Sequence, residues 1–141
     1  TRRSSDLVTA IAQRYGFTSS EELRTLTGMA SGNAVENWTS TRDCGSFLSQ
    51  VYAGTLVSKN ASERMMQLLL GQTRRTKIPA GVPFGVKVAN KTGELAAVQN
   101  DVAIVFGTHP YVLAVMSNDI SSAVAPSQIT ELSRAVWDAA Q

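Results

Sequence analysis

The stretch that decides the fold is Val86-Lys87-Val88-Ala89-Asn90-Lys91-Thr92-Gly93-Glu94, followed by the apolar runs Val102-Ala103-Ile104-Val105-Phe106 and Tyr111-Val112-Leu113-Ala114-Val115-Met116. The first segment alternates with a period of two, which predicts a half-buried strand. The second is an unbroken apolar run, which is typical of a strand covered on both faces. Only four residues, 107–110, separate the two apolar runs, so these strands pair antiparallel. We predict a three-stranded antiparallel meander.

Four helical patterns precede this meander. The first extends to Gly16, the second begins at Ser19 or Ser20, and the others extend to Gly54 and Gly71, because glycine commonly ends a helix. The second is short and runs into a Gly/Ser/Asn-rich loop. The apolar faces, assigned from helical spacing, comprise Leu7, Val8, Ile11 and Tyr15; Leu23 and Leu26; Phe47, Leu48, Val51 and Tyr52; and Met65, Met66, Leu68, Leu69 and Leu70.

Two further signals place helix starts. Asn60, with Glu63 three residues later, resembles a capping box, and Pro126 opens a last helix because proline is tolerated in a first turn. The apolar stripe of that last helix comprises Ile129, Leu132, Val136 and Ala140, and we expect both Trp38 and Trp137 in the core. The sequence therefore predicts an α+β fold in one domain over residues 1–141: helices, a three-stranded meander and a C-terminal helix.

Composition narrows the class of protein. The 141 residues are 43% hydrophobic and 17% charged, as in folded globular domains. The net charge of +2 does not indicate a nucleic-acid partner. No apolar run approaches the roughly 20 residues of a membrane-spanning helix, and residues 1–6 lack a signal-peptide pattern. Because the sequence does not begin with Met, we expect a processed or excised piece of a longer protein.

The chemistry open to the chain is limited by its single Cys44 and single His109. One cysteine excludes an intrachain disulfide and a cysteine-based zinc cluster, and we predict neither a metal nor another cofactor. Any catalysis must use Ser, Lys, Thr or a carboxylate. We interpret His109 as an exposed turn residue in preference to a catalytic one, and Cys44 as a small buried residue in preference to a reactive thiol.

Lys91-Thr92-Gly93 at the end of an alternating strand is one of three signatures of penicillin-recognising serine enzymes. The order of helix, Pro-Ala-Gly-Val-Pro loop, Lys-Thr-Gly strand, Asn-Asp and two apolar strands resembles the C-terminal half of class A β-lactamases and their serine-hydrolase relatives. Four segments carry the likeness, namely residues 37–43, 56–64, 72–83 and 100–105. The resemblance implies part of an α/β/α sandwich.

The resemblance also implies a site. Lys91 and Thr92 would be catalytic, with the Lys91 ammonium beside a serine nucleophile and the Thr92 hydroxyl donating to a substrate carboxylate. Substrate would contact Lys91, Thr92, Gly93 and Glu94, and Gly93 would let its backbone lie close to the strand. Glu94 departs from the family, in which small or hydroxyl residues are usual at this position. We expect its carboxylate to neutralise part of the Lys91 charge.

Other family signatures are missing. No Ser has Lys three residues later, so the Ser-x-x-Lys nucleophile is absent. Ser5-Asp6 continues with Leu7 instead of Asn and is interpreted as a helix cap. Residues 31–33 and 58–60 fit a looser Ser-x-Asn form, but their positions indicate a turn and a helix cap. Glu36 lacks the Arg expected before a general base, which favours a penicillin-binding or D-alanyl-D-alanine-peptidase-like parent over an efficient β-lactamase.

Two groups near the strand have structural interpretations. Arg74, Arg75 and Lys77 could attract an anionic substrate, but a solvated loop is the preferred interpretation. We expect Asp101 to cap the turn before its strand.

Three hypotheses remain open for the whole chain. The first is the C-terminal portion of a secreted, periplasmic or cell-surface bacterial serine hydrolase, inactive alone, with a β-lactam or peptidoglycan-peptide-like substrate. Its partner would be the missing N-terminal portion or a second copy. The second is a non-catalytic binding or interaction domain derived from that fold. The third is an unrelated α+β domain.

Overall fold

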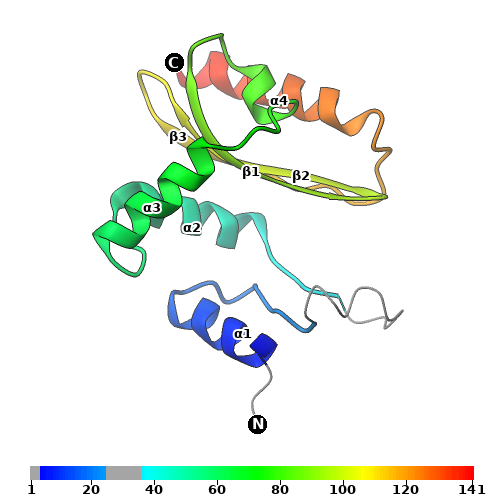
Figure 1. The fold of residues 1–141 in the computed structure, drawn as a ribbon. Coiled ribbons are helices and arrows are strands. Elements are labelled where there is room, and N and C mark those ends of the chain that lie inside the picture. Colours follow the sequence, from blue (N-terminus) through cyan, green and yellow to red (C-terminus); the bar gives the residue numbers. More distant parts are fainter. Residues whose placement is uncertain (1–3, 25–35) are drawn as a thin grey trace. The chain divides into compact units, whose positions relative to one another are not determined.

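Apart from the short second helix, the order of helices and strands follows the pattern that the sequence predicts (Figure 1). The computed structural model describes residues 4–24 and 36–141. It divides into two compact units, Thr1–Phe47 and Leu48–Gln141, and the division falls within helix α2. The elements are α1 (Ser4–Arg14), α2 (Thr41–Ala53), α3 (Lys59–Leu70), the short 3-10 helix η2 (Ile78–Gly81), β1 (Lys87–Leu95), β2 (Val98–Phe106), β3 (Tyr111–Val115) and α4 (Ala125–Ala140).

The described strands form the predicted meander. The sheet has the order β1-β2-β3, and both neighbouring pairs are antiparallel. Residues 96–97 connect β1 to β2, so both strands extend beyond the apolar and alternating runs that predicted them. In the register, Thr92 lies opposite Asp101, and Asp101 lies opposite Val115. Because side chains alternate along a strand, these three residues share one face of the sheet.

That face carries the hydrophobic core. Val88, Ala103 and Val105 pack there with Ile78 of η2 and Ile129 of α4. The opposite face is also covered, because α3 packs on β1. Figure 1 shows α4 and α3 on opposite sides of the sheet. Burial on both faces explains the unbroken apolar run in β2.

Helix α4 joins the core through η2. The Ser133 hydroxyl donates to the Ile78 carbonyl at 2.9 Å, and the Thr130 hydroxyl donates to the Lys77 carbonyl at 3.1 Å. The two elements approach so closely that a Cβ on Gly81 would lie 2.5 Å from the Thr130 carbonyl oxygen. Only glycine fits this contact without a shift of the backbone.

The predicted stripe of α4 is partly wrong. Its buried residues are Ala125, Ile129 and Ser133, spaced by four, whereas Leu132 is 46% exposed. The hydrogen bond of Ser133 to η2 fixes which side of the helix faces inward. Trp137 packs against the core as predicted, but Trp38 is 65% exposed and does not.

In the unit Thr1–Phe47, α1 forms as predicted, but the short second helix does not over its described residues. Glu21 instead pairs with Trp38 in an isolated antiparallel bridge. The Ser19 amide and the Ser20 hydroxyl both donate to Asp43 Oδ2 at 2.8 Å, which ties the segment before this bridge to the first turn of α2. Leu26 and the 31–33 turn lie outside the described residues.

Candidate functional site

Strand β1 presents Lys91 and Thr92 to opposite sides of the sheet, since neighbouring residues in a strand alternate. Lys91 is exposed, and its Nζ donates to the Thr92 carbonyl oxygen. Thr92 is buried, 8% exposed, on the face that also carries Asp101. The two residues predicted to act together are therefore adjacent in sequence but have their side chains on different faces.

Gly93 lies opposite Asn100 in the register. A Cβ on Gly93 would be 3.6 Å from the Asn100 Cβ, which is ordinary van der Waals contact. The neighbours present in the structure therefore do not require glycine at this position.

Glu94 does not neutralise Lys91, contrary to the prediction. Its carboxylate pairs with Arg74 and with Lys77 Nζ, the latter at 3.1 Å. The physical reason is the alternation of the strand, because residues three apart point to opposite faces. The hydrogen bond from Lys77 is the main cause that lowers the pKa of Glu94 below its usual value, and partial burial opposes it.

The burial of Lys77 is the feature that the sequence did not indicate. Its side chain is 1% exposed, and Nζ also donates to the Asn100 carbonyl at 3.1 Å. The solvated-loop interpretation is therefore wrong for Lys77, although the Arg74 side chain is 66% exposed. No local pattern marks Lys77 as buried, because its partners lie 17 and 23 residues away along the chain.

Asp101 is the centre of a second buried polar group. It is fully buried, and its two carboxylate oxygens accept from the Ile78 amide and from Asn90 Nδ2, each at 3.0 Å. Burial raises the pKa of Asp101, and these hydrogen bonds oppose the rise. Asp101 is structural as predicted, but it caps η2 and not the turn before its strand, because β2 already begins at Val98.

Together these contacts fix the segment before η2 against the sheet beside Thr92. Asn90 Nδ2 also donates to the Arg74 carbonyl at 3.3 Å. The arrangement leaves the Lys91 ammonium exposed on one face, while the charges of Glu94 and Lys77 are paired on the other. Chemically, the site offers the cation of Lys91 on an outer strand of the described sheet, with the hydrogen-bonded side chains of Lys77 and Asp101 on the opposite face.

The remaining candidates keep modest roles. His109 is exposed in its turn, and its amide donates to Gln141 Oε1 at 3.2 Å. Cys44 is half-buried, with Sγ 3.6 Å from the Thr39 hydroxyl. Glu36 forms an ion pair with Arg24. Within residues 4–24 and 36–141, no three His, Cys, Asp or Glu side chains gather to hold a metal ion.

Over the same described ranges, none of the helices combines the length and the apolar character needed to cross a bilayer.

The architecture of this sheet, with its flanking helices, is that of β-lactamases and penicillin-binding relatives. The structure is similar to a β-lactamase from Sphaerobacter thermophilus DSM 20745, with a TM-score of 0.88 and 24% identity over 97% of this chain and 54% of that one. It is similar to PBP-A, with a TM-score of 0.83 and 24% identity over 96% and 51% of the respective chains. It is also similar to TLA-3 extended-spectrum β-lactamase, with a TM-score of 0.88 and 24% identity over 96% of this chain and 54% of that one. At these identities the likeness shows the fold.

The family follows from the sequence itself. Residues 4–140 match the Beta-lactamase2 profile, described as the beta-lactamase enzyme family, and the chain belongs to that family. No curated protein matches the chain. The chain spans about half the length of the solved relatives described above.

Proposed function

We propose that this chain is the C-terminal portion of a penicillin-recognising serine hydrolase and contributes the Lys91-Thr92-Gly93 strand to its acyl-transfer site. The observation that carries the proposal is the exposed Lys91 ammonium on the outer strand of a sheet whose fold β-lactamases share. The substrate class is a β-lactam or a peptidoglycan-type peptide ending in D-alanyl-D-alanine. The protein works outside the cytoplasm, in the periplasm or at the cell surface.

Each residue has a distinct role in this proposal. Lys91 supplies positive charge beside the attacking serine and toward the substrate carboxylate. Thr92 supplies a hydroxyl next to Lys91. Because the Thr92 side chain is buried on its face of the sheet, substrate would approach this hydroxyl along the open edge of β1. Gly93 and Glu94 line the path of the substrate. The ion pairs with Arg74 and Lys77 keep the Glu94 carboxylate away from that path.

The nucleophile comes from other polypeptide in this proposal. The sequence contains no Ser-x-x-Lys, so the chain alone forms no acyl-enzyme. The same absence supports the second candidate function, a non-catalytic binding domain that kept the strand and lost the chemistry. The two candidate functions make different predictions for the sequence encoded upstream of Thr1. The hydrolase requires a Ser-x-x-Lys motif there, and the binding domain does not.

The test is covalent labelling with a fluorescent penicillin, read by intact-mass spectrometry. The 141-residue chain alone should give no adduct. Refolded together with the polypeptide encoded upstream of Thr1, it should give an adduct on a serine of that polypeptide. Lys91→Ala should slow this acylation by about 100-fold, since removing one group that stabilises the transition-state charge costs on the order of 10²–10³.

Lys59→Ala, which removes an exposed lysine at the start of α3, is the matched control and should label at the wild-type rate. An adduct on the chain alone would refute the absence of a nucleophile. Equal labelling of Lys91→Ala and Lys59→Ala would refute the role of Lys91. An upstream sequence without Ser-x-x-Lys, with no adduct in any mixture, would establish the non-catalytic candidate.

A further inference from the structure

A cavity of about 510 Å³ lies at the beginning of β1. It is lined by the end of α3, by η2 and the loop that follows it, and by the first residues of the strand. Its volume falls within the range of roughly 300–1,000 Å³ that is typical of small-molecule sites. Nothing in the proposed acyl-transfer site uses this cavity. Lys87 lies four residues before Lys91, roughly 13 Å along the strand at about 3.3 Å per residue.

The polar lining of this cavity is cationic. Arg75 and Lys87 both line it and are both exposed, and among the described residues that line it there is no carboxylate. Arg75 Nη1 forms a long hydrogen bond of 3.5 Å to the Val88 carbonyl, which places the guanidinium beside the strand. Two cations without a lining counter-charge favour an anionic ligand.

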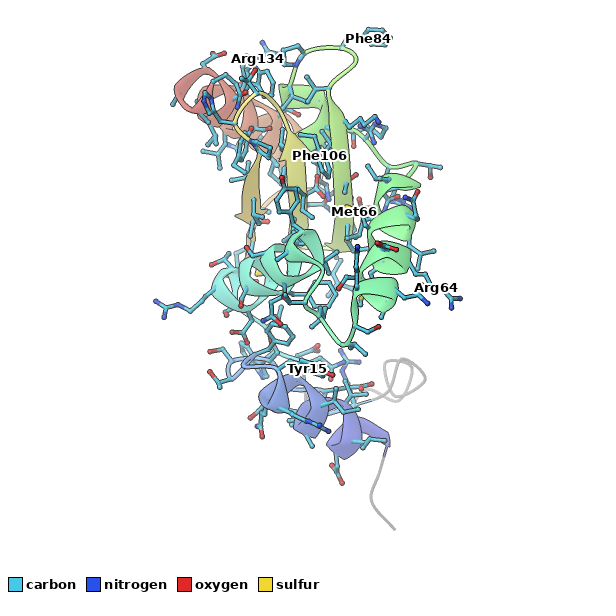
Figure 2. All side chains as sticks on the ribbon, turned by 90° about the vertical axis from the view of Figure 1, so that its left-hand side faces the viewer. Tyr15, Arg64, Met66, Phe84, Phe106 and Arg134 are labelled. Carbon is cyan, nitrogen blue, oxygen red and sulfur yellow. The ribbon has the colours of Figure 1, made fainter. Side chains whose placement is uncertain are left out.

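The rest of the lining is apolar and includes an exposed aromatic ring. Leu70 and Val86 line the cavity, and Phe84 lies at its rim with its side chain fully exposed. Figure 2 shows Phe84 on the loop before β1, directed away from the sheet. Phe84 lies in a turn in which the Val86 amide donates to the Pro83 carbonyl at 3.2 Å and Gly85 has a φ of 88°. This turn directs the ring outward. A ligand that covers an exposed phenyl ring removes apolar surface from water, and this favours binding.

We propose that this cavity binds a small amphipathic organic anion, a carboxylate or sulfonate with an aromatic or aliphatic body. The anionic group would lie between Arg75 and Lys87, where the guanidinium offers a planar pair of donors. The apolar body would lie against Leu70 and Val86, and the exposed Phe84 ring would turn toward the cavity to cover it. The inference does not depend on the proposed acyl-transfer function, because it uses none of its residues.

The experiment titrates the full chain with 8-anilinonaphthalene-1-sulfonate and follows fluorescence together with amide chemical shifts by NMR. We expect shift changes concentrated at residues 84–88 and at Arg75. Arg75→Gln and Lys87→Gln should each raise the Kd about two- to fivefold, since a partly exposed ion pair contributes up to about that factor. Phe84→Ala should also weaken binding.

Arg64→Gln, which removes an exposed arginine of α3 that does not line this cavity, is the matched control and should keep the wild-type Kd. The neutral analogue N-phenyl-1-naphthylamine should bind more weakly than the sulfonate. Equal binding of the two probes, equal Kd values for Arg64→Gln and the two cavity variants, or shift changes confined to α1 would each overturn the proposal. Circular dichroism of each variant separates loss of the site from loss of the fold.

Discussion

At the scale of single residues, the decisive feature is that Lys77 is buried as a cation. Removing an ammonium from water costs several kcal/mol, so a buried lysine needs a carboxylate and further acceptors close by. Glu94 and the Asn100 carbonyl supply them, each 3.1 Å from Nζ. Glu94 itself remains partly exposed and has Arg74 as a second partner. The two partners are therefore not equivalent. Lys77 has lost its contact with water and needs the carboxylate, whereas Glu94 still contacts water and Arg74.

This asymmetry gives a stability prediction. Glu94→Ala removes the carboxylate that pairs with the buried Lys77 ammonium and leaves Asp101 as the nearby negative charge, so it should lower the free energy of unfolding by about 2–4 kcal/mol. Lys77→Met removes the buried charge itself and should cost about 1 kcal/mol or less. Urea denaturation at pH 7 measures both. The ranking would be contradicted if Lys77→Met proved the more damaging substitution.

The pH dependence follows from the same carboxylate. The pKa of Glu94 is lowered in the folded state, so its stabilising contribution is present above about pH 4.5 and is lost as the pH falls through the lowered pKa. Asp101 has a raised pKa and acts in the opposite sense, with its contribution present below pH 3.8 and lost as the pH rises through the raised value. In a Glu94→Gln variant, we expect the loss of stability below pH 4.5 to become shallower. Identical acid-denaturation curves for the two proteins would exclude Glu94 as the cause.

At the scale of elements, the sequence located helices and strands better than it located their ends. The alternation in β1 and the apolar run in β2 predicted the meander correctly. The helix-cap interpretation of residues 58–60 is confirmed, but the capping-box pattern at Asn60 is not, because Ser58 is the N-cap of α3 and its hydroxyl accepts from the Ala61 amide at 3.1 Å. Both residues are good caps by type, so local pattern alone could not choose between them.

The caps can be distinguished by substitution. Ser58→Ala should lower the free energy of unfolding by about 1 kcal/mol, because it leaves the Ala61 amide without its side-chain acceptor. Asn60→Ala, two residues away and inside the helix, should be neutral or slightly stabilising, since alanine is the better helix former. Thermal unfolding of both variants measures the difference, and a larger loss for Asn60→Ala would reverse the assignment.

At the scale of the whole molecule, the chain spans about half of the β-lactamase chains that it resembles. Strands β1 and β3 are the outer strands of the described sheet, so each has one edge without a neighbouring strand. In α1, Leu7, Val8 and Ile11 are each about half exposed, although they form the predicted apolar stripe. Free strand edges and exposed apolar stripes are surfaces through which chains associate.

We therefore expect the isolated chain to self-associate or to bind the polypeptide that completes its fold. Light scattering after gel filtration should give a mass above 15.1 kDa that rises with concentration. Addition of the upstream polypeptide should replace these species with a single one-to-one complex. A stable monomer with cooperative unfolding at all concentrations would contradict this expectation.

The sequence by itself determined the α+β order, the antiparallel meander and the family, because periodicity, short links and local signatures are encoded within a few residues of each other. The tertiary structure alone decided that Lys77 is buried, that Glu94 pairs with Lys77, that Asp101 caps η2, and that Trp38 is exposed. Each of these depends on contacts between residues far apart in the chain, or on which side of an element packs inward. Burial of a charge is favourable only when a distant partner arrives, and local composition does not specify that partner.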